Sequence, residues 1–560
     1  MDHVGSKPWL AHYDPGVPPE VEVPAIPLWR FLENSASRYA HHVALDFLGK
    51  TLTYAELWEK SRRFAEGLKA LGVKPGDRVA IMLPNTPQFV IAFYGTLLAG
   101  GVGVNVNPLY TPRELRHQLK DSGAETLVIL DHLLPRFLEV EGETPVKRTV
   151  VTGIKDFLPF PKNLLYPLKA KRDKLPLGFP KREGFHAFLD LLKHPPATPH
   201  PADPEDLALL QYTGGTTGIS KGAMLTHRNL VANVLQIDAW DSTSKELQGK
   251  GVMLGALPFF HVYGMTVAMN YGIYSGYKIV LLARPEIHAI VEAIEKHQVT
   301  HFPGVPTLYV AFNHFPGIEK RNVKSIRICL SGAAPLPVEV AKRFEEITGA
   351  RLIEGYGLSE ASPVTHSNPV LGEVKKGSIG MPLPSVEAKV VDEEGNEVPL
   401  GEVGELIVKG PNVMKGYWNR PEETQKALKD GWLFTGDMAR MDQDGYFYIV
   451  DRKKDMIIAG GYNIYPREVE EVLYQHEAVQ EAAVVGVPDP YRGETVAAFI
   501  VLKEAYKGKV TEKDLEAFCR QNLAAYKVPR IIEFRDNLPK SSVGKILRRE
   551  LREEFAKRQP

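Results

Sequence analysis

Residues 207–222 read LALLQYTGGTTGISKG, an apolar run followed by glycines, threonines and a lysine. A short apolar run that ends at a turn signal predicts a buried strand. The loop after it can turn backbone N–H groups and hydroxyls around an anion, and Lys221 adds a positive charge. It is not a Walker A loop, because two residues separate Gly218 from Lys221. We therefore predict a phosphate-binding loop over Tyr212–Gly222, and the simpler alternative is a flexible surface turn.

The flanking sequence predicts layered α/β structure. In residues 53–72, apolar side chains recur at helical spacing and Gly72 supplies a stop signal. Apolar runs of strand length occur at 79–83, 126–130 and 148–151, and each is followed by a turn or a helical pattern. This alternation is typical of α/β layers with largely parallel sheets.

The last third of the chain predicts two further parts. Residues 407–450 have short strands and Gly/Asn/Asp turns, which indicate a small antiparallel or barrel portion. After Asp451 the pattern becomes a small α+β unit, so we predict an N-terminal domain over 1–450 and a C-terminal domain over 451–560.

Composition excludes several classes of protein. The 560 residues carry 68 Lys+Arg and 68 Asp+Glu, so no net charge recruits nucleic acid. The two cysteines, Cys329 and Cys519, provide neither a disulfide framework nor a thiolate metal cluster. Residues 89–104 are apolar but short and rich in glycine, which predicts a buried helix and strand rather than a membrane span. The first residues lack the basic start and apolar run of a signal peptide, so we expect a cytoplasmic protein.

Four further motifs follow the loop in order. Residues 356–360 read YGLSE, 435–437 read TGD, 451–455 read DRKKD and 539–549 read PKSSVGKILRR. Together with the loop they resemble the ordered motifs of the adenylate-forming superfamily, which includes acyl-CoA synthetases, luciferases and adenylation domains. The stretches IVDRKKDMI and GGYNIYP are most similar to bacterial long-chain fatty acyl-CoA synthetases of the FadD type. The chain departs from the wider pattern at Gly214, where serine is commoner, and at Ser220, where proline is usual.

The resemblance implies a fold and an activity. The fold is α/β: a large N-terminal domain of two layered subdomains and a small β-barrel, hinged to an α+β lid. The activity is ligation of a long-chain fatty acid to CoA, driven by ATP with Mg²⁺, through an acyl-adenylate. Three alternatives stay open: an acyl-AMP ligase that loads a carrier protein, a medium-chain or aryl acid–CoA ligase, and a lipid-responsive nucleotide-binding protein without catalysis. A homodimer is also left open.

The resemblance also implies which residues act on ATP. Lys545, Glu360 and His261 are the implied catalytic residues, and Thr213 and Glu360 the metal contacts. Lys545 is expected to offset the charge that develops between the carboxylate and the α-phosphate. Tyr356 is expected to stack on adenine, and Asp437, assisted by Arg452, to accept the ribose hydroxyls. The implied ATP-binding residues are Thr213, Gly214, Gly215, Thr216, Thr217, Gly218, Lys221, Gly332, Ala333, Ala334, Glu354, Gly355, Tyr356, Gly357, Ser359, Asp437 and Arg452.

Two further sets are implied for the acyl group and CoA. The acyl site is assigned to His261, Tyr263, Gly264, Gly304 and Val305. The small Gly264 and Gly304 suggest room for a chain, although a lone histidine on an apolar segment is more often a core residue. Asp451 is the implied hinge, whose rotation brings Gly460, Gly461 and Tyr462 to a pantetheine channel.

One segment stands apart from this scheme. Residues 155–193 carry nine Lys/Arg against four Asp/Glu, with Phe, Leu, Tyr and Pro interleaved. Basic and apolar residues in one segment are typical of contact with an anionic membrane surface, and a solvated surface excursion is the alternative. The segment therefore predicts peripheral contact with the inner face of the membrane.

Overall fold

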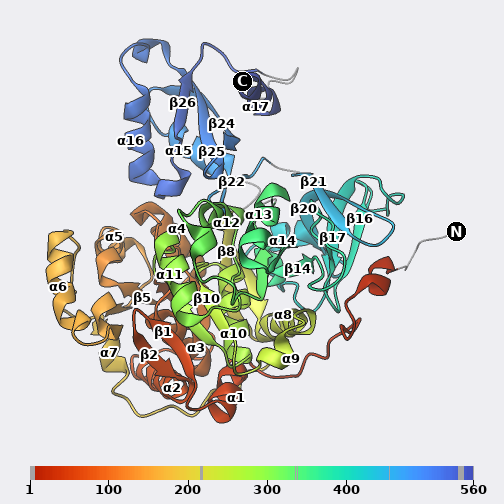
Figure 1. The fold of residues 1–560 in the computed structure, drawn as a ribbon. Coiled ribbons are helices and arrows are strands. Elements are labelled where there is room, and N and C mark those ends of the chain that lie inside the picture. The colour runs from red at the N-terminus through yellow and green to blue at the C-terminus, as the bar shows by residue number, and fades with distance from the viewer. Residues whose placement is uncertain are drawn as a thin grey trace.

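A computed structural model describes residues 7–214, 219–333, 336, 338–452, 455–539 and 548–558. Two large sheets with their helices form the body of the molecule, a smaller antiparallel sheet lies beside them, and the C-terminal unit covers one end (Figure 1). This arrangement confirms the predicted α/β class and the order of its parts.

The first sheet carries the predicted phosphate loop near one edge. Its strands pair in parallel from β8 to β7, and β9 and β18 extend it in the antiparallel direction. The predicted strands at 79–83, 126–130 and 148–151 are β3, β5 and β6. The spatial order is β18 (Gly416–Tyr417), β9 (Ser220–Thr226), β8 (Leu207–Gly214), β4 (Val102–Asn105), β3 (Arg78–Met82), β5 (Thr126–Leu130), β6 (Arg148–Thr152) and β7 (Phe185–Ala187).

The helices beside this sheet follow from local sequence. Helix α2 (Tyr54–Ala70) begins at a capping box from Thr53 and buries its apolar side. Helix α4 (Pro112–Ser122) begins at a second capping box, from Thr111 to Glu114, and ends at Gly123 in the left-handed conformation. The apolar run over 89–104 forms α3 (Pro87–Leu98) and β4, and α3 is buried along its whole length. The prediction of a buried helix and strand is confirmed.

The second sheet has two parts that meet at His301. Its backbone bridges β10 on one side and β12 on the other. The residues at the carboxyl ends of β12 and β13 include several that the sequence analysis assigns to ATP binding. The order is β2 (Lys50–Thr53), β1 (Val43–Phe47), β11 (Lys278–Leu281), β10 (Val252–Gly255), then β12 (Ile328–Ser331), β13 (Arg351–Gly357), β14 (Val364–Ser367) and β15 (Met381–Pro382).

The third sheet is an antiparallel half-barrel of five strands, as the turn-rich sequence predicts. The long β20 is its centre and carries the TGD motif. Asp451, the predicted hinge, lies by its backbone in β21, opposite Met438. The strands are β16 (Glu387–Val391), β17 (Gly404–Lys409), β19 (Leu428–Lys429), β20 (Trp432–Met441) and β21 (Phe447–Arg452).

The C-terminal unit has its own apolar core, built around a five-stranded sheet and two helices. This is the α+β pattern that the sequence predicts after Asp451. The elements are β22 (Ile457–Ala459), β23 (Tyr462–Ile464), α15 (Pro466–Tyr474), β24 (Val479–Asp489), β25 (Gly493–Leu502), α16 (Glu512–Asn522), η9 (Ala525–Lys527), β26 (Ile531–Phe534) and α17 (Arg548–Lys557).

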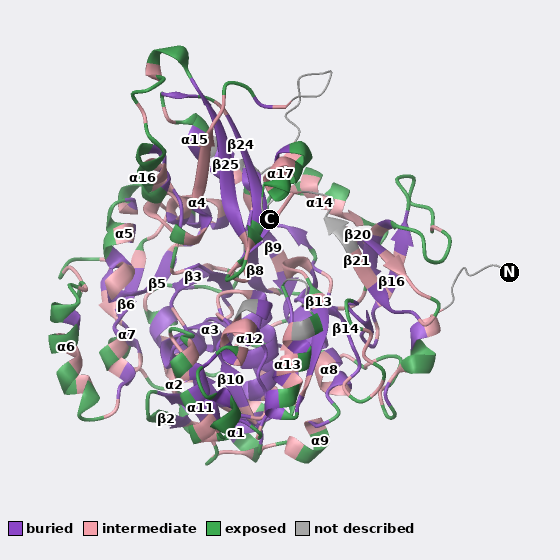
Figure 2. Cartoon of the chain, turned by 45° about the horizontal axis from the view of Figure 1, so that its top comes forward, coloured by how far each residue is buried: buried purple, intermediate pink, exposed green. Residues whose placement is uncertain are grey.

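Helix α6 (Lys162–Arg172) lies at the periphery of the body, within the basic segment 155–193. Its surface is largely exposed (Figure 2). Among the described residues, no helix combines the length and the apolar character that crossing a bilayer requires.

Candidate active site

The predicted phosphate loop joins two antiparallel strands at the edge of the site. Strand β8 ends at Gly214, and β9 starts at Ser220, with Thr213 opposite Lys221 in the register. Lys221 is buried, and its ammonium lies 4.3 Å from the centroid of the Tyr417 ring. Burial lowers the pKa of Lys221 from its ordinary value. Four loop residues lie outside the described part of the chain: Gly215, Thr216, Thr217 and Gly218.

Glu360 follows β13 in a short turn, η7 (Ser359–Ala361). Gly357 allows this turn because a Cβ atom there would lie 2.3 Å from the carbonyl oxygen of Pro363. Burial raises the pKa of Glu360, and a hydrogen bond from the Tyr417 hydroxyl, at 3.2 Å, opposes that shift. One partly buried carboxylate therefore interacts with the cation of Lys221.

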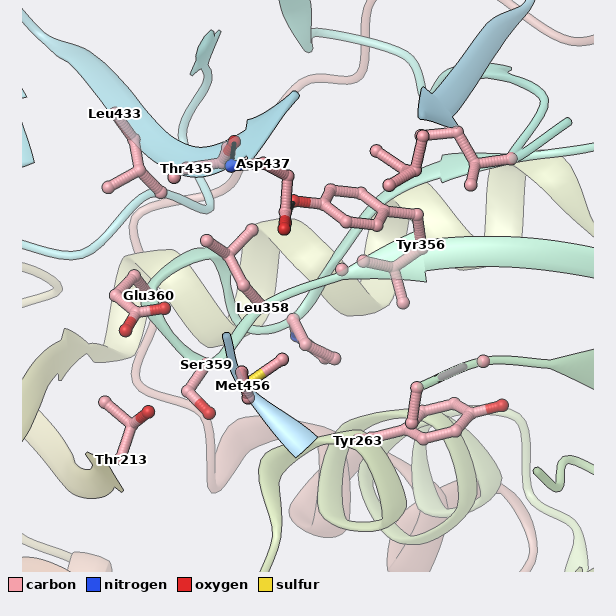
Figure 3. A pocket seen from close by; sticks show the side chains of 18 of the residues that line it. Thr213, Tyr263, Tyr356, Leu358, Ser359, Glu360, Leu433, Thr435, Asp437 and Met456 are labelled. Carbon is pink, nitrogen blue, oxygen red and sulfur yellow. Dashed lines mark hydrogen bonds between the residues drawn. The ribbon is translucent and has the colours of Figure 1, made fainter. Parts of the chain in front are cut away.

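Tyr356 and Asp437 meet across the cavity, from β13 and β20. The Tyr356 hydroxyl donates to Asp437 Oδ2 at 2.6 Å (Figure 3). Burial is the largest cause that raises the pKa of Tyr356, and the Asp437 carboxylate adds to it. The YGLSE and TGD motifs, which lie far apart in the sequence, thus meet in one place.

The predicted adenine walls lie at the ends of β12 and β13. Gly332, Ala333, Glu354 and Gly355 line the same cavity as Tyr356. The Glu354 carboxylate is buried and accepts the backbone N–H of Leu336 at 2.9 Å. Burial raises the pKa of Glu354 to about 7. The remaining member of the predicted wall, Ala334, lies outside the described residues.

These groups surround a single cavity of about 520 Å³. Figure 3 shows the side chains of Thr213, Ser359, Glu360, Asp437 and Tyr356 around it. The structure thus brings most of the described predicted ATP residues together. The predicted residues that line the cavity are Thr213, Lys221, His261, Tyr263, Gly332, Ala333, Glu354, Gly355, Tyr356, Gly357, Ser359, Glu360 and Asp437.

His261 also lines this cavity, where burial lowers its pKa to about 4. Its Nδ1 accepts the backbone N–H of Tyr263 at 3.2 Å. The Tyr263 hydroxyl donates to the carbonyl oxygens of Gly304 and Leu330. His261 is therefore a neutral ring at neutral pH.

Protein atoms lie close to the backbone at Gly264 and Gly304, which the resemblance assigns to the acyl site. A Cβ atom at Gly264 would lie 2.3 Å from the carbonyl oxygen of Pro258, and one at Gly304 would lie 3.0 Å from the Tyr309 ring. Both glycines therefore allow neighbouring protein atoms to approach, and room for an acyl chain beside them stays a prediction. Gly264, Gly304 and Val305 are not among the cavity-lining residues.

The C-terminal unit closes part of the cavity. Met456, Ile458 and Tyr465 line it, and the Tyr465 side chain is hydrogen-bonded to Thr213. A Cβ atom at Gly461 would lie 3.1 Å from Val305, so the Gly460–Gly461 turn packs on the N-terminal domain. The Tyr462 ring stacks on Tyr526, with centroids 4.3 Å apart.

Three further predicted residues lie wholly or partly outside the described structure. Lys545 lies outside the described residues. Asp451 and Arg452 are described by their backbone alone, at the end of β21, where Arg452 lies opposite Asp437.

Sequence reasoning missed several residues of the cavity wall. Tyr417 contacts both Lys221 and Glu360, yet its surroundings in the sequence form none of the motifs used above. Tyr465 lies within the quoted stretch GGYNIYP and Met456 within IVDRKKDMI, and membership of these stretches was the available signal.

Comparisons with known proteins agree with this geometry. A model described as AMP-binding enzyme matches residues 32–418, and a model described as AMP-binding enzyme C-terminal domain matches residues 468–545. A long-chain-fatty-acid–CoA ligase of Bacillus subtilis is 52% identical over 553 residues, 98% of each chain. One from Escherichia coli O6:H1 is 44% identical over 558 residues, again 98% of each chain. A solved long-chain-fatty-acid–CoA ligase of Archaeoglobus fulgidus is 27% identical, with a TM-score of 0.74 over 93% of this chain and 99% of that one.

Proposed function

Because the chain belongs to the AMP-binding enzyme family, we propose that it ligates a long-chain fatty acid to CoA. In the first half-reaction the carboxylate attacks the α-phosphorus of ATP and pyrophosphate leaves. In the second, the CoA thiol attacks the acyl-adenylate carbonyl and AMP leaves. The observation that carries the proposal is the meeting of the loop, YGLSE and TGD residues around one cavity. The predicted ligase activity is confirmed by relatives named for it over nearly the whole chain.

The cavity offers ATP a separate partner for each of its parts. We assign adenine to the Tyr356 ring and to the wall at Glu354, and ribose to Asp437. The phosphates are assigned to the loop that starts at Thr213 and to Lys221. The reaction brings an anion toward a polyanion, so these residues act mainly by positioning and neutralising charge.

Mg²⁺ fits this donor set. The described residues hold no cluster of three or more His, Cys, Asp or Glu side chains. Mg²⁺ does not require one, because it is commonly held by one or two carboxylates while water and phosphate complete its shell. The partly buried Glu360 carboxylate and the Thr213 hydroxyl, which lines the same cavity, would hold it, and the bound ion would neutralise phosphate charge.

We assign the fatty acid carboxylate to the His261 side of the cavity. A neutral imidazole can donate a hydrogen bond to the carboxylate without forming an ion pair that would neutralise its negative charge. Such a partner keeps the carboxylate nucleophilic.

We further propose that the C-terminal domain serves both half-reactions by turning about Asp451. Lys545 would serve the first, and Gly460, Gly461 and Tyr462 the second. Lys545→Ala should lose most adenylation and spare thioester formation from supplied acyl-adenylate. Asp451→Pro should slow at least one half-reaction, since proline restricts the backbone torsion φ. Wild-type rates in both half-reactions of Asp451→Pro would remove the hinge from the scheme.

An ATP–pyrophosphate exchange assay with acids of increasing length tests the function. We expect exchange with long fatty acids, and acyl-CoA when CoA is added. Exchange without acyl-CoA would favour a carrier-loading ligase, and a preference for short or aromatic acids would favour the other ligases. Absence of exchange with every acid would leave the non-catalytic alternative.

We also propose that residues 155–193 contact the inner, anionic face of the membrane. Helix α6 exposes Leu164, Leu165 and Leu168 by 64%, 58% and 68%, and Phe160 before it is 78% exposed. Exposed lysines and arginines surround these apolar groups: Lys155, Lys162, Lys169, Lys171, Arg172 and Lys174. Apolar residues that can enter the acyl region, ringed by cations that pair with lipid phosphates, are typical of an interfacial helix.

Co-sedimentation with phosphatidylglycerol vesicles tests this contact. Each buried leucine contributes about 1.5–3 kcal/mol, so replacing Leu164, Leu165 and Leu168 together by serine should lower binding well over tenfold. The matched control replaces Leu371, Leu400 and Val403, which are exposed elsewhere on the surface. Equal binding of the α6 variant and the wild type would refute the proposal. Light scattering of the wild-type protein without vesicles gives its mass in solution and so distinguishes a monomer from a homodimer.

A further inference from the structure

A buried ion triad joins the two domains outside the cavity. Lys527 Nζ lies 2.5 Å from Glu114 Oε2 and 2.9 Å from Glu468 Oε1. The side chain of Lys527 is 7% exposed, that of Glu114 is 9% exposed and that of Glu468 is 23% exposed. Burying a charge costs free energy unless the charge is paired, so loss of one partner from the triad should be destabilising.

The two carboxylates differ in which domain carries them. Glu468, on α15, belongs to the same domain as Lys527 and stays with it in any orientation of the lid. Glu114, on α4, belongs to the N-terminal domain. Its Oε1 accepts the backbone N–H of Thr111 in the capping box, and its Oε2 faces Lys527. The Lys527–Glu114 pair therefore exists only when the lid lies in this orientation.

This orientation also places the predicted CoA residues. Tyr526, next to Lys527, accepts a hydrogen bond from Asn107 Nδ2 at 3.1 Å, and its ring stacks on Tyr462. On the same side, Gly461 packs against Val305. The triad and the implied pantetheine turn thus lie on one docked face of the lid.

We propose that Lys527 is a positioning residue which, by pairing with Glu114, selects the lid orientation that serves thiol transfer. The inference rests on the proposed two-step ligase. When the lid turns away, Glu114 returns to water and Lys527 keeps Glu468 alone. A contact made in one state and absent from the other shifts the equilibrium between them by its free energy.

Glu114→Gln tests the role, because glutamine keeps the shape and the acceptor for Thr111 but removes the charge. Thioester formation from supplied acyl-adenylate and CoA should slow about tenfold. ATP–pyrophosphate exchange should change less than about twofold, because Glu114 lies outside the cavity and is not paired with Lys527 in the orientation that serves adenylation. The control is Arg113→Gln, the neighbouring residue, whose contact with Gln475 crosses the same interface at an exposed position. The rates of both half-reactions in Arg113→Gln should stay within about twofold of the wild-type rates.

Glu468→Gln is the reciprocal variant. In this variant Lys527 keeps Glu114 as its partner when the lid is docked, but it has neither carboxylate when the lid turns away. The rate of ATP–pyrophosphate exchange should therefore fall relative to the rate of thioester formation. A general loss of folding would lower both rates together, and melting curves of each variant detect it. Equal changes of both half-reactions in Glu114→Gln, or the same direction of change in both variants, would overturn the role of Lys527. A wild-type protein without exchange activity would instead overturn the proposed function.

Discussion

The hydroxyl of Tyr356 donates a hydrogen bond to Asp437 Oδ2 at 2.6 Å, joining the end of β13 to the centre of β20. A hydrogen bond to a charged group contributes about 1.5–3 kcal/mol. The same tyrosine is assigned to adenine and the same aspartate to ribose, so one contact sets the spacing of both nucleoside partners.

Two substitutions of Tyr356 separate these roles. Tyr356→Phe keeps the ring and should raise the KM for ATP a few-fold, because Asp437 loses one partner. Tyr356→Ala also loses stacking, worth about 1–3 kcal/mol per base, and should raise the KM at least about tenfold. The KM for ATP is measured by pyrophosphate exchange. Equal effects of the two substitutions would exclude stacking by Tyr356.

Glu354 predicts a pH-dependent stability. Burial raises its pKa to about 7, above the unfolded value of 4.5, so its stabilising contribution is present below pH 4.5 and lost as pH rises through 7. The full loss is about 3 kcal/mol. Glu354→Gln stays neutral and keeps an acceptor for Leu336, so its melting temperature relative to the wild type should rise between pH 5 and pH 8.

A difference between Glu354→Gln and the wild type that is constant with pH would contradict this prediction. Glu345→Gln is a control of the same chemistry at a half-exposed position of α13 (Val338–Thr348). Its melting temperature gives the effect of replacing a glutamate by glutamine where the side chain is not buried.

Local signals were sufficient to predict much of the fold. The apolar spacing over 53–72 and the stop signal at Gly72 predict one helix, and α2 forms there, over Tyr54–Ala70. The apolar run over 89–104 was too short to span a bilayer, and it folds as α3 and β4. Such features depend on neighbouring residues, so a single sequence contains them.

The candidate site depended on a different kind of information. Spacing and propensity say nothing of the meeting of Tyr356 with Asp437, and the ordered motifs alone predicted that both act on ATP. Tyr417 was missed because its contacts with Lys221 and Glu360 form only when distant segments pack together. The close approach of the Pro258 carbonyl to Gly264 was not predictable for a related reason: a glycine looks the same in sequence whether it faces a ligand or a backbone carbonyl.

Tyr417 predicts a second effect on ATP binding. Its ring lies 4.3 Å from the Lys221 ammonium, and a desolvated cation–π contact contributes about 2 kcal/mol. Tyr417→Leu should therefore raise the KM for ATP about tenfold, while Tyr417→Phe, which keeps the ring, should raise it less. Equal effects of phenylalanine and leucine would instead assign the role of Tyr417 to its hydroxyl, which both substitutions remove and which donates to Glu360.

Gly264→Ala should destabilise the protein without changing its acyl preference. The added methyl group would overlap the carbonyl oxygen of Pro258, and the backbone cannot yield as a flexible side chain does. Overpacking of this kind costs about 1–3 kcal/mol, so the melting temperature should fall. Exchange rates with acids of increasing length should keep the wild-type order, because the methyl group does not enter the cavity. Gly142→Ala is a control for loss of a glycine, since its Cβ atom would meet open space and its backbone is not in the left-handed region. A shift toward shorter acids in Gly264→Ala would show that this position does face the acyl chain.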